Sequence, residues 1–473
     1  MKARITIFIT LVASFILLAR ADMITWENDY ALEFGDGINS IEPTSDGGYI
    51  AGGWYYQQLS IDVYQIHARL IKIDSYGNME WERAFMLADI AMSGIKSIIE
   101  NSDGDFIATG FSEVAGRSDA VMVLKYDKDG NFIWSKFYGN LNNTQGNVIK
   151  ETEDKGYIIA GREAINDSIN AASIIRLDSN CDSLWTVTNN IGINSEYRSL
   201  MIDQNDFVAV GYSQDETYDY DGLVMKVDSL GSKVWEKYNE ISLGASCIDY
   251  EGNYICAWGF GFYKYNQFGD TLYSKEFGSD LITGIKSLMK VNDGNYICAG
   301  QVDTPDEYGT NYDWCIIKFD QNLDTLWKQV YGHKTRTSDD YLWGGCKPTT
   351  DGGYIAGGNI YHYSYAMKLD ENGTVGIMDN GQLIIDNYSL EQNYPNPFNN
   401  QTTITYKLQN MCEVDVSIYN SNGQFVQNLV NKRQAKGNYG ITFNGSKLNS
   451  GVYYYRLKID VEVKDTKKMI YLR

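Results

Sequence analysis

Four carboxylates lie close together in the stretch SQDETYDYDG (213–222): Asp215, Glu216, Asp219 and Asp221. Carboxylate oxygens are ligands that Ca²⁺ prefers in proteins, so this stretch is a candidate metal site, with calcium the only cofactor that the sequence suggests. A pair of carboxylates is also the chemistry of glycoside cleavage. The alternative is an exposed acidic loop that is simply solvated.

Aromatic side chains in other irregular stretches suit a sugar or protein ligand. They occur in WYYQQLSIDVYQ (54–65), QVDTPDEYGTNYD (301–313) and GHKTRTSDDYLWGG (332–345). Tyr and Trp offer a flat apolar face together with a polar edge, which allows stacking on a sugar ring. The predicted ligand-binding residues are Tyr55, Tyr56, Asp303, Asp306, Tyr308 and Trp343.

Motifs of familiar enzymes are missing from the sequence. It contains neither a G-x-S-x-G nucleophile motif nor a phosphate-binding loop. The three histidines, His67, His333 and His362, have no spacing that would suit zinc. The sequence therefore predicts no catalytic residue, and it does not identify an enzyme.

Composition favours an all-β globular protein. The chain of 473 residues is 44% hydrophobic and 14% aromatic, with only 5 prolines and 45 glycines. Its net charge of −21 argues against nucleic acid as a partner. The 7 cysteines are odd in number and form no C-x-x-C pair. Cys256 and Cys298 occupy repeat positions that hold alanine elsewhere, so we expect small core residues rather than disulfides.

One octapeptide, DGGYIAGG, occurs at 46–53 and again at 351–358. Relatives of it place an aromatic residue about every 50 positions, and strand-like repeats of that length are typical of a β-propeller. The seven aromatic residues are Tyr49, Phe106, Tyr157, Phe207, Tyr254, Tyr296 and Tyr354.

A second motif follows each octapeptide: an apolar strand, an Asp-containing turn and an aromatic residue, normally Trp. The last copy ends before its Trp, whereas Trp26 precedes the first copy. We therefore expect the N-terminal strand to complete the seventh blade, with the two identical octapeptides on the same inner strand of adjacent blades. The aromatic residues of this structural repeat are Trp26, Trp81, Trp134, Trp185, Trp235, Tyr273 and Trp327.

Each blade should contain four strands, which in the first blade are 38–43, 49–56, 67–73 and 79–85. Short Asp-Gly and Asp-x-x-Gly corners lie on one face of the disc, and long irregular connections lie on the other. Varied loops on a rigid scaffold are the usual place for binding. The repeat resembles the tryptophan-docking motif of quinoprotein-like and kelch-like propellers, which implies the fold but places no quinone ligand here.

The N-terminus has the pattern of a signal peptide over residues 1–21. Lys2 and Arg4 precede an apolar run at 5–18, and Ala19-Arg20-Ala21 is a cleavage pattern. No other stretch is long and apolar enough to span a membrane, so we expect no span in the mature chain.

The C-terminal part reads as a linker at 377–391 and a small Ig-like β-sandwich at 392–473, which follow a propeller at 22–376. Its motifs include NYPNPF at the start, SGVYYYRL late and KKM near the end. This tail resembles the type A sorting domain of the type IX secretion system. The residues that carry the resemblance include Asn393, Tyr394, Pro395, Asn396, Pro397, Phe398, Gly451, Tyr453, Arg456 and Lys468.

The resemblance implies the type IX machinery as partner, and passage through the periplasm and outer membrane to the cell surface or medium. From the sequence we expect an exported propeller that binds a glycan or protein through its long-loop face. Two alternatives stay open: a secreted carbohydrate-active hydrolase or lyase that uses loop carboxylates, and a structural or adhesive surface protein.

Overall fold

A computed structural model describes residues 25–472 with internal gaps, and it divides the chain into two compact units, 1–376 and 377–473. The gaps are 31, 33–34, 61–62, 87–89, 115–119, 140–142, 167, 260, 278–281, 283, 305–311, 333–339, 361–362, 376–387, 409–411, 422, 435–436, 447 and 460–461. The predicted signal peptide and most of the predicted linker lie outside the described residues. Within the described ranges every regular element is a strand, and they include no helix that could cross a membrane.

The strands of the first unit form groups of four in which successive strands pair antiparallel. Group 1 contains β2 (Asp36–Pro43), β3 (Tyr49–Ser60), β4 (Val63–Ile73) and β5 (Met79–Phe85). Group 2 contains β6 (Ile90–Glu100), β7 (Phe106–Val114), β8 (Ala120–Tyr126) and β9 (Phe132–Tyr138). Group 3 contains β10 (Gln145–Glu151), β11 (Tyr157–Asn166), β12 (Ile169–Leu177) and β13 (Ser183–Asn189).

The remaining groups repeat this order. Group 4 contains β14 (Asn194–Asp203), β15 (Asp206–Gln214), β16 (Tyr220–Val227) and β17 (Lys233–Asn239). Group 5 contains β18 (Leu243–Ile248), β19 (Tyr254–Trp258), β20 (Gly261–Tyr265) and β21 (Thr271–Glu276). Group 6 contains β22 (Gly284–Lys290), β23 (Tyr296–Asp303), β24 (Tyr312–Phe319) and β25 (Thr325–Tyr331). Group 7 contains β26 (Tyr341–Pro348), β27 (Tyr354–Ile360), β28 (Tyr363–Leu369) and the N-terminal β1 (Trp26–Asp29).

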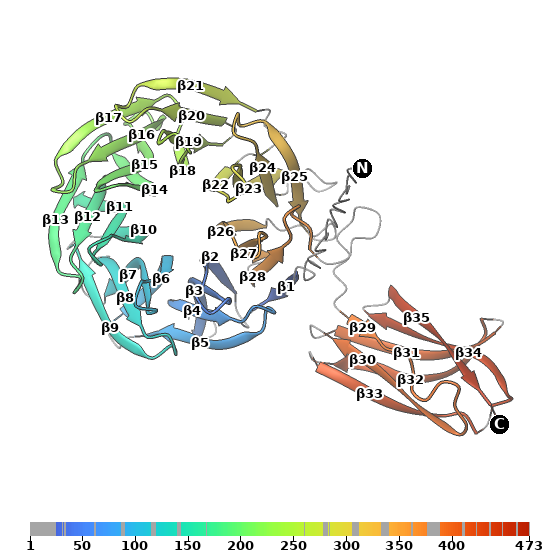
Figure 1. Cartoon of the computed structure of the whole chain (residues 1–473). Coiled ribbons are helices and arrows are strands. Elements are labelled where there is room, and N and C mark those ends of the chain that lie inside the picture. Colours follow the sequence, from blue (N-terminus) through green and yellow to red (C-terminus); the bar gives the residue numbers. More distant parts are fainter. Residues whose placement is uncertain are drawn as a thin grey trace, which may run out of the picture. The chain divides into compact units, whose positions relative to one another are not determined.

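The groups stand around a common axis, with β2, β6, β10, β14, β18, β22 and β26 innermost (Figure 1). The octapeptides therefore lie on the second strand of their groups, β3 and β27, which agrees with the expected order of strands 38–43, 49–56, 67–73 and 79–85. The prediction that they are spatial neighbours is confirmed, because β2 contacts both β26 and β27. Tyr49, Ala51 and Ile355 also belong to one core cluster.

The predicted closure by the N-terminal strand is confirmed. β1 pairs antiparallel with β28, and Trp26 lies opposite Lys368. The indole Nε1 of Trp26 donates a hydrogen bond of 3.0 Å to the carbonyl oxygen of Ser75 in group 1. The N-terminal strand thus joins the last group to the first.

In five of the seven groups, the outer-strand aromatic residue packs against a turn glycine in the next group. A Cβ atom on Gly77 would lie 2.6 Å from the Trp26 indole, and one on Gly130 would lie 2.9 Å from Trp81. Glycine therefore combines two roles here, a positive φ for the turn and room for the indole. The same contact joins Trp185 to Gly231, Trp235 to Gly269 and Trp327 to Gly373.

The described cysteines are core residues. Cys181, Cys247, Cys256, Cys298, Cys315 and Cys346 are all buried and free of disulfides. Burial raises the pKa of the Cys315 thiol to about 12, so it stays protonated at neutral pH. The expectation that Cys256 and Cys298 fill small core positions is confirmed.

The second unit consists of two antiparallel sheets around one core. One sheet has the order β29 (Tyr388–Leu390), β30 (Gln401–Leu408), β33 (Gly437–Asn444). The other has the order β32 (Phe425–Gln434), β31 (Cys412–Asn420), β34 (Gly451–Ile459), β35 (Glu462–Tyr471). Ile404 and Tyr406 of the first sheet share a hydrophobic cluster with Val416 and Leu457 of the second.

Candidate functional site

The acidic stretch between β15 and β16 is a tight turn. Oδ1 of Asp215 accepts hydrogen bonds from the backbone nitrogens of Thr217 at 2.8 Å and Asp219 at 3.1 Å. Hydrogen bonds from the Thr217 side chain and from the Asp219 backbone lower the pKa of the Asp215 carboxyl. Asp215 therefore serves the turn, as an Asx motif does.

The four candidate calcium ligands Asp215, Glu216, Asp219 and Asp221 are all exposed. They are among the described residues, in which no group of three or more His, Cys, Asp or Glu side chains converges on a point that could hold a metal ion. These four side chains therefore do not form a preformed calcium-binding site.

The predicted ligand-binding residues come from three groups. Tyr55 and Tyr56 lie on β3 of group 1, Asp303 ends β23 of group 6, and Trp343 lies near the start of β26 in group 7. Trp343 is exposed and its ring is 5.4 Å from that of Tyr341. Asp306 and Tyr308 lie outside the described residues. Tyr55, Tyr56 and Trp343 each make ring contacts within their own group.

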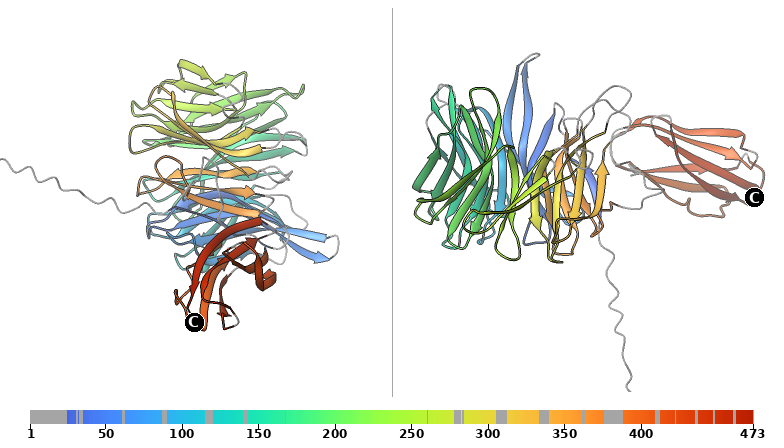
Figure 2. Two further views of the ribbon diagram at one scale, coloured as in Figure 1. Left: turned by 90° about the vertical axis from the view of Figure 1, so that its right-hand side faces the viewer. Right: turned by 90° about the horizontal axis from the view of Figure 1, so that it is seen from above.

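Aromatic rings gather instead on the hairpin of β3 and β4. These strands extend beyond their neighbours in the unit (Figure 2, blue). On one face, the Tyr56 ring lies 5.1 Å from that of Trp54 and 6.2 Å from that of Tyr64, both in edge-on geometry. Tyr64 is 47% exposed, so this aromatic row is open to solvent.

The other face of the hairpin is more polar. The Tyr55 ring lies 5.5 Å from that of His67, and His67 Nε2 is 2.9 Å from Oε1 of Gln57. Burial lowers the pKa of His67, so its ring is neutral at pH 7. Tyr55 thus belongs to a different face from Tyr56.

Trp54 and Tyr64 were missed as candidate site residues. Both stand in the quoted stretch 54–65, and two patterns could have revealed them. Residues 54 and 56 share one face of a strand because side chains alternate, and Gln58 pairs with Tyr64 across the hairpin. The sequence analysis did not predict this hairpin, since we expected one strand to end at residue 56 and the next to begin at residue 67.

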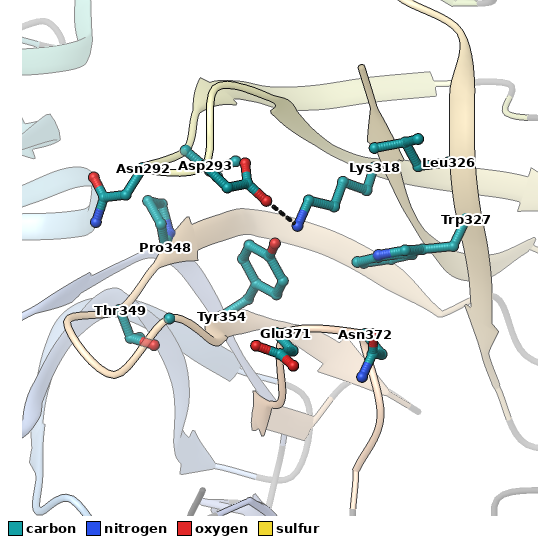
Figure 3. Close-up of a pocket in the computed structure, with 12 residues that line it drawn as sticks. Asn292, Asp293, Lys318, Leu326, Trp327, Pro348, Thr349, Tyr354, Glu371 and Asn372 are labelled. Carbon is teal, nitrogen blue, oxygen red and sulfur yellow. Dashed lines mark ion pairs between the residues drawn. The ribbon is translucent and has the colours of Figure 1, made fainter. Parts of the chain in front are cut away.

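A pocket of about 380 Å³ lies between groups 6 and 7, on the side of the short turns (Figure 3). Nζ of Lys318 forms an ion pair of 2.6 Å with Asp293 and lies 5.8 Å from the centre of the Tyr354 ring. Burial disfavours the charge on Lys318, but its bonds to Asp293 and Tyr354 outweigh this and raise its pKa. Trp327 closes the outer side, 6.0 Å from the Tyr354 ring.

The ion pair in this pocket is part of the repeat. In each group, a Lys or Arg on the third strand pairs with an Asp beside the first turn. These pairs are Lys72–Asp46, Lys125–Asp105, Arg176–Asp154, Lys226–Asp203, Lys264–Asp249, Lys318–Asp293 and Lys368–Asp351, all at 2.6 to 2.9 Å. Because all seven groups share it, the pair is a structural part of each group and does not single out this pocket as a ligand site.

In the second unit, the NYPNPF segment is held against the last strand. Phe398 is buried, and its backbone nitrogen donates to the Ile470 carbonyl at 2.9 Å. The Asn396 amide donates to the carbonyl oxygen of Lys468 at 3.3 Å. The first and last motifs of the resemblance thus form one contact.

Asn393 anchors the start of this segment. Its amide donates to Oγ1 of Thr402 at 2.9 Å and to the Pro395 carbonyl at 3.1 Å, and its backbone nitrogen donates to the Tyr455 hydroxyl at 2.9 Å. Tyr394, the next residue, is 83% exposed. Asn393 is therefore fixed by the fold, while Tyr394 is available to another molecule.

Comparison with protein families places residues 392–472 in the family described as the secretion system C-terminal sorting domain. A comparison with curated proteins finds no match. The structure of virginiamycin B lyase from Staphylococcus aureus is 11% identical and covers 73% of this chain and 98% of its own, with a TM-score of 0.44.

Two further structures span more of the chain. The extracellular domain of a putative one component system from B. thetaiotaomicron is 12% identical and covers 94% of this chain and 57% of its own, with a TM-score of 0.43. PorZ, a surface component of the type IX secretion system of Porphyromonas gingivalis, is 11% identical and covers 92% and 75%, with a TM-score of 0.29. Likeness at this level carries no information about ligand or activity.

The match to the sorting-domain family is a sequence match to one segment, and the first and last motifs of that segment contact each other in the structure. Residues 392–472 are a type IX secretion sorting domain, and the chain is exported through that system to the cell surface or the medium.

Proposed function

We propose that this protein is an exported seven-bladed β-propeller that binds a glycan through the aromatic row Trp54, Tyr56 and Tyr64, with an Ig-like sorting sandwich as its tail. Each four-stranded group serves as one blade. The observation that carries the binding proposal is the projecting hairpin, on which the rings of Trp54 and Tyr56 are half-buried and that of Tyr64 is exposed.

The row has the properties of a stacking platform. The Trp54 ring packs directly against Gly37, where an added Cβ atom would lie only 3.1 Å from the indole nitrogen. This contact restricts the ring. The Gln58 amide donates to the Tyr64 hydroxyl at 3.2 Å, which orients that ring. Rings that are already ordered lose little entropy when a sugar stacks on them.

A glycan array with the full mature chain tests the proposal. Tyr56→Ala and Tyr64→Ala should each weaken glycan binding by about tenfold or more, as loss of a stacking contact does. Tyr76→Ala is the matched control, because Tyr76 is 64% exposed on a short turn outside the hairpin and should leave binding unchanged.

Equal effects of Tyr64→Ala and Tyr76→Ala would reject the hairpin as the site. Binding of a protein but no glycan would reject the ligand class. A parallel polysaccharide-hydrolysis assay covers the enzymatic alternative: product formation that is lost in Asp219→Asn or Asp221→Asn would favour the hydrolase or lyase.

A further inference from the structure

Some neighbouring groups of the ring are tied together at the turn between their first and second strands. At the boundary of groups 1 and 2, the backbone nitrogen and the hydroxyl of Ser45 donate to the two carboxylate oxygens of Glu100 at 2.6 and 2.7 Å. At the boundary of groups 2 and 3, Ser102 forms the same two bonds with Glu151 at 2.7 and 2.8 Å. Each tie closes the corner between two groups.

This tie cannot form at the boundary of groups 6 and 7. Pro348 pairs with Tyr354 across the first two strands as Glu100 pairs with Phe106, so Pro348 occupies the position of the acceptor glutamate. The donor position holds Asn292. Because proline has no side-chain acceptor, this corner is not closed in the same way.

Outer-strand tryptophans make a second kind of tie. The indole N–H, which is the only donor of that side chain, donates to a backbone carbonyl in a turn of the next group. The bonds measure 3.0 to 3.1 Å, and the pairs are Trp26–Ser75, Trp185–Ser229 and Trp235–Gln267.

Trp327, at the boundary of groups 6 and 7, is turned differently. A Cβ atom on Gly373 would lie 2.8 Å from Cη2 and Cζ3 of Trp327, whereas one on Gly231 would lie 2.9 Å from Cδ2 of Trp185. The far edge of the Trp327 six-membered ring therefore faces the turn. Its N–H donates to no residue in the described part of the chain.

A third tie comes from the side chain two residues after the outer aromatic residue. Nε of Arg83 donates to the Gly130 carbonyl of the next group at 2.7 Å, whereas Nε2 of Gln329 is 3.5 Å from the Asn372 carbonyl. Among the described residues, two ties are thus missing and the third is long at the boundary of groups 6 and 7.

The pocket of about 380 Å³ lies at this boundary. Tyr354 inside it is buried, while Leu326 on its outer side is 52% exposed. The Tyr354 ring stands between Lys318 and Glu371, with Trp327 beside it (Figure 3). The space is of a size typical of small-molecule sites, which occupy about 300–1,000 Å³.

The lining of the pocket suits a neutral, hydroxylated ligand. Trp327 and Tyr354 offer aromatic surface against which the C–H groups of a sugar ring pack. The Trp327 N–H and the amides of Asn292 and Asn372, both exposed, are donors for hydroxyl oxygens. Lys318 is already in an ion pair of 2.6 Å, so an anion gains little from its charge.

We propose that the pocket between groups 6 and 7 binds a short neutral saccharide, which packs on Trp327 and supplies an acceptor for its N–H. The pocket lies at the strand ends that carry the short turns, whereas the aromatic row lies on the β3–β4 connection at the opposite strand ends. This site is therefore independent of the aromatic row, and neither proposal requires the other.

The test is calorimetric titration of the full mature chain with glucose, galactose, mannose, N-acetylglucosamine, maltose, cellobiose and lactose in separate arms, with glycerol as the reference. We expect saturable binding of at least one saccharide, and a melting temperature that rises with its concentration. A response no greater than that to glycerol in every arm would overturn the proposal.

Two variants locate the site. Trp327→Phe keeps an aromatic ring and removes the N–H, and Asn292→Ala removes one amide, so each should weaken binding by about threefold to tenfold. The matched controls are Trp81→Phe, at the equivalent position of group 1, and Asn205→Ala, an exposed amide in the first turn of group 4. Both controls should leave binding unchanged.

Tyr64→Ala separates this site from the aromatic row. Unchanged binding in Tyr64→Ala, with weaker binding in Trp327→Phe, supports the pocket. The reverse pattern would assign the saccharide to the aromatic row and overturn the proposal for the pocket. If Trp327→Phe does not fold, Asn292→Ala keeps the test because Asn292 is exposed, and undiminished affinity in that variant would also overturn the proposal.

Discussion

Ser364 donates its backbone N–H to Oδ1 of Asp36 at 2.5 Å, although 328 positions separate the two residues in the chain. The other oxygen of Asp36 accepts from the guanidinium of Arg69, which also donates to the Tyr30 carbonyl at 2.6 Å. This buried junction connects β28 of group 7 with β2 and β4 of group 1. The junction lies beside the N-terminal strand. The pairing of β1 with β28 and this polar junction therefore both contribute to closing the ring.

The first prediction concerns Trp26, which is 9% exposed. Trp26→Ala should lower the free energy of unfolding by about 3–5 kcal/mol, because it removes a buried aromatic side chain and leaves a cavity. Chemical denaturation measures this. Trp343→Ala is the control: its ring is 37% exposed, and a much smaller loss is expected. A near-neutral Trp26→Ala would mean that the N-terminal strand contributes little to closure.

The second prediction concerns the buried ion pair. Asp36→Asn leaves Arg69 buried without its main partner, although Glu82 still accepts from Nε of Arg69 at 2.9 Å. We expect a loss of about 3 kcal/mol in denaturant unfolding. The exposed pair Lys155–Asp103 provides the comparison, since Asp103→Asn should have a far smaller effect. Similar losses in the two variants would contradict the importance of the junction.

The repeat made most of the ring predictable from the sequence. Each aromatic residue such as Trp81 and each turn glycine such as Gly130 recurs at a regular interval, and the unmatched Trp26 indicated the closure. The order of strands within a group also followed from the sequence, because the turn glycines mark the corners between strands 38–43, 49–56, 67–73 and 79–85.

The candidate site was less predictable because it depends on departures from the repeat. As described, β3 and β4 are longer than the equivalent strands of the other groups, so the repeat does not predict the hairpin that brings Tyr56 to Tyr64.

The third prediction concerns the sorting domain. Asn393→Ala removes the two amide hydrogen bonds to Thr402 and Pro395 and leaves the buried Thr402 hydroxyl with one partner fewer. It should destabilise the second unit by about 1–3 kcal/mol, seen as an earlier unfolding transition of that unit, and leave the transition of the first unit in place. Tyr394→Ala should preserve stability because the ring is exposed. If it also lowers the amount of protein outside the cell, Tyr394 contacts the secretion machinery.

The last prediction concerns Lys150, which faces Lys347, Glu42 and Cys247. Its pKa is about 8 in the folded protein, lowered from 10.5 by burial and by Lys347. Between these two pH values the unfolded chain binds a proton that the folded chain has released, so stability rises with pH over this window. Lys150 is exposed, so we base the prediction on the repulsion by Lys347 rather than on burial. Below pH 8 both states are protonated, and this repulsion is fully present. Lys150→Met removes it, and this variant should therefore be more stable than the native chain at pH 7.

The difference between Lys150→Met and the native chain should shrink as pH rises from 8 toward 10.5. Denaturant unfolding at several pH values in this range measures it, and subtracting the native curve removes the titration of all other groups. Lys155→Met should not show this pattern, because Asp103 raises the pKa of Lys155 and gives its contribution the opposite sign. A Lys150→Met effect that is the same at pH 7 and pH 10 would mean that Lys150 keeps an ordinary pKa in the folded protein.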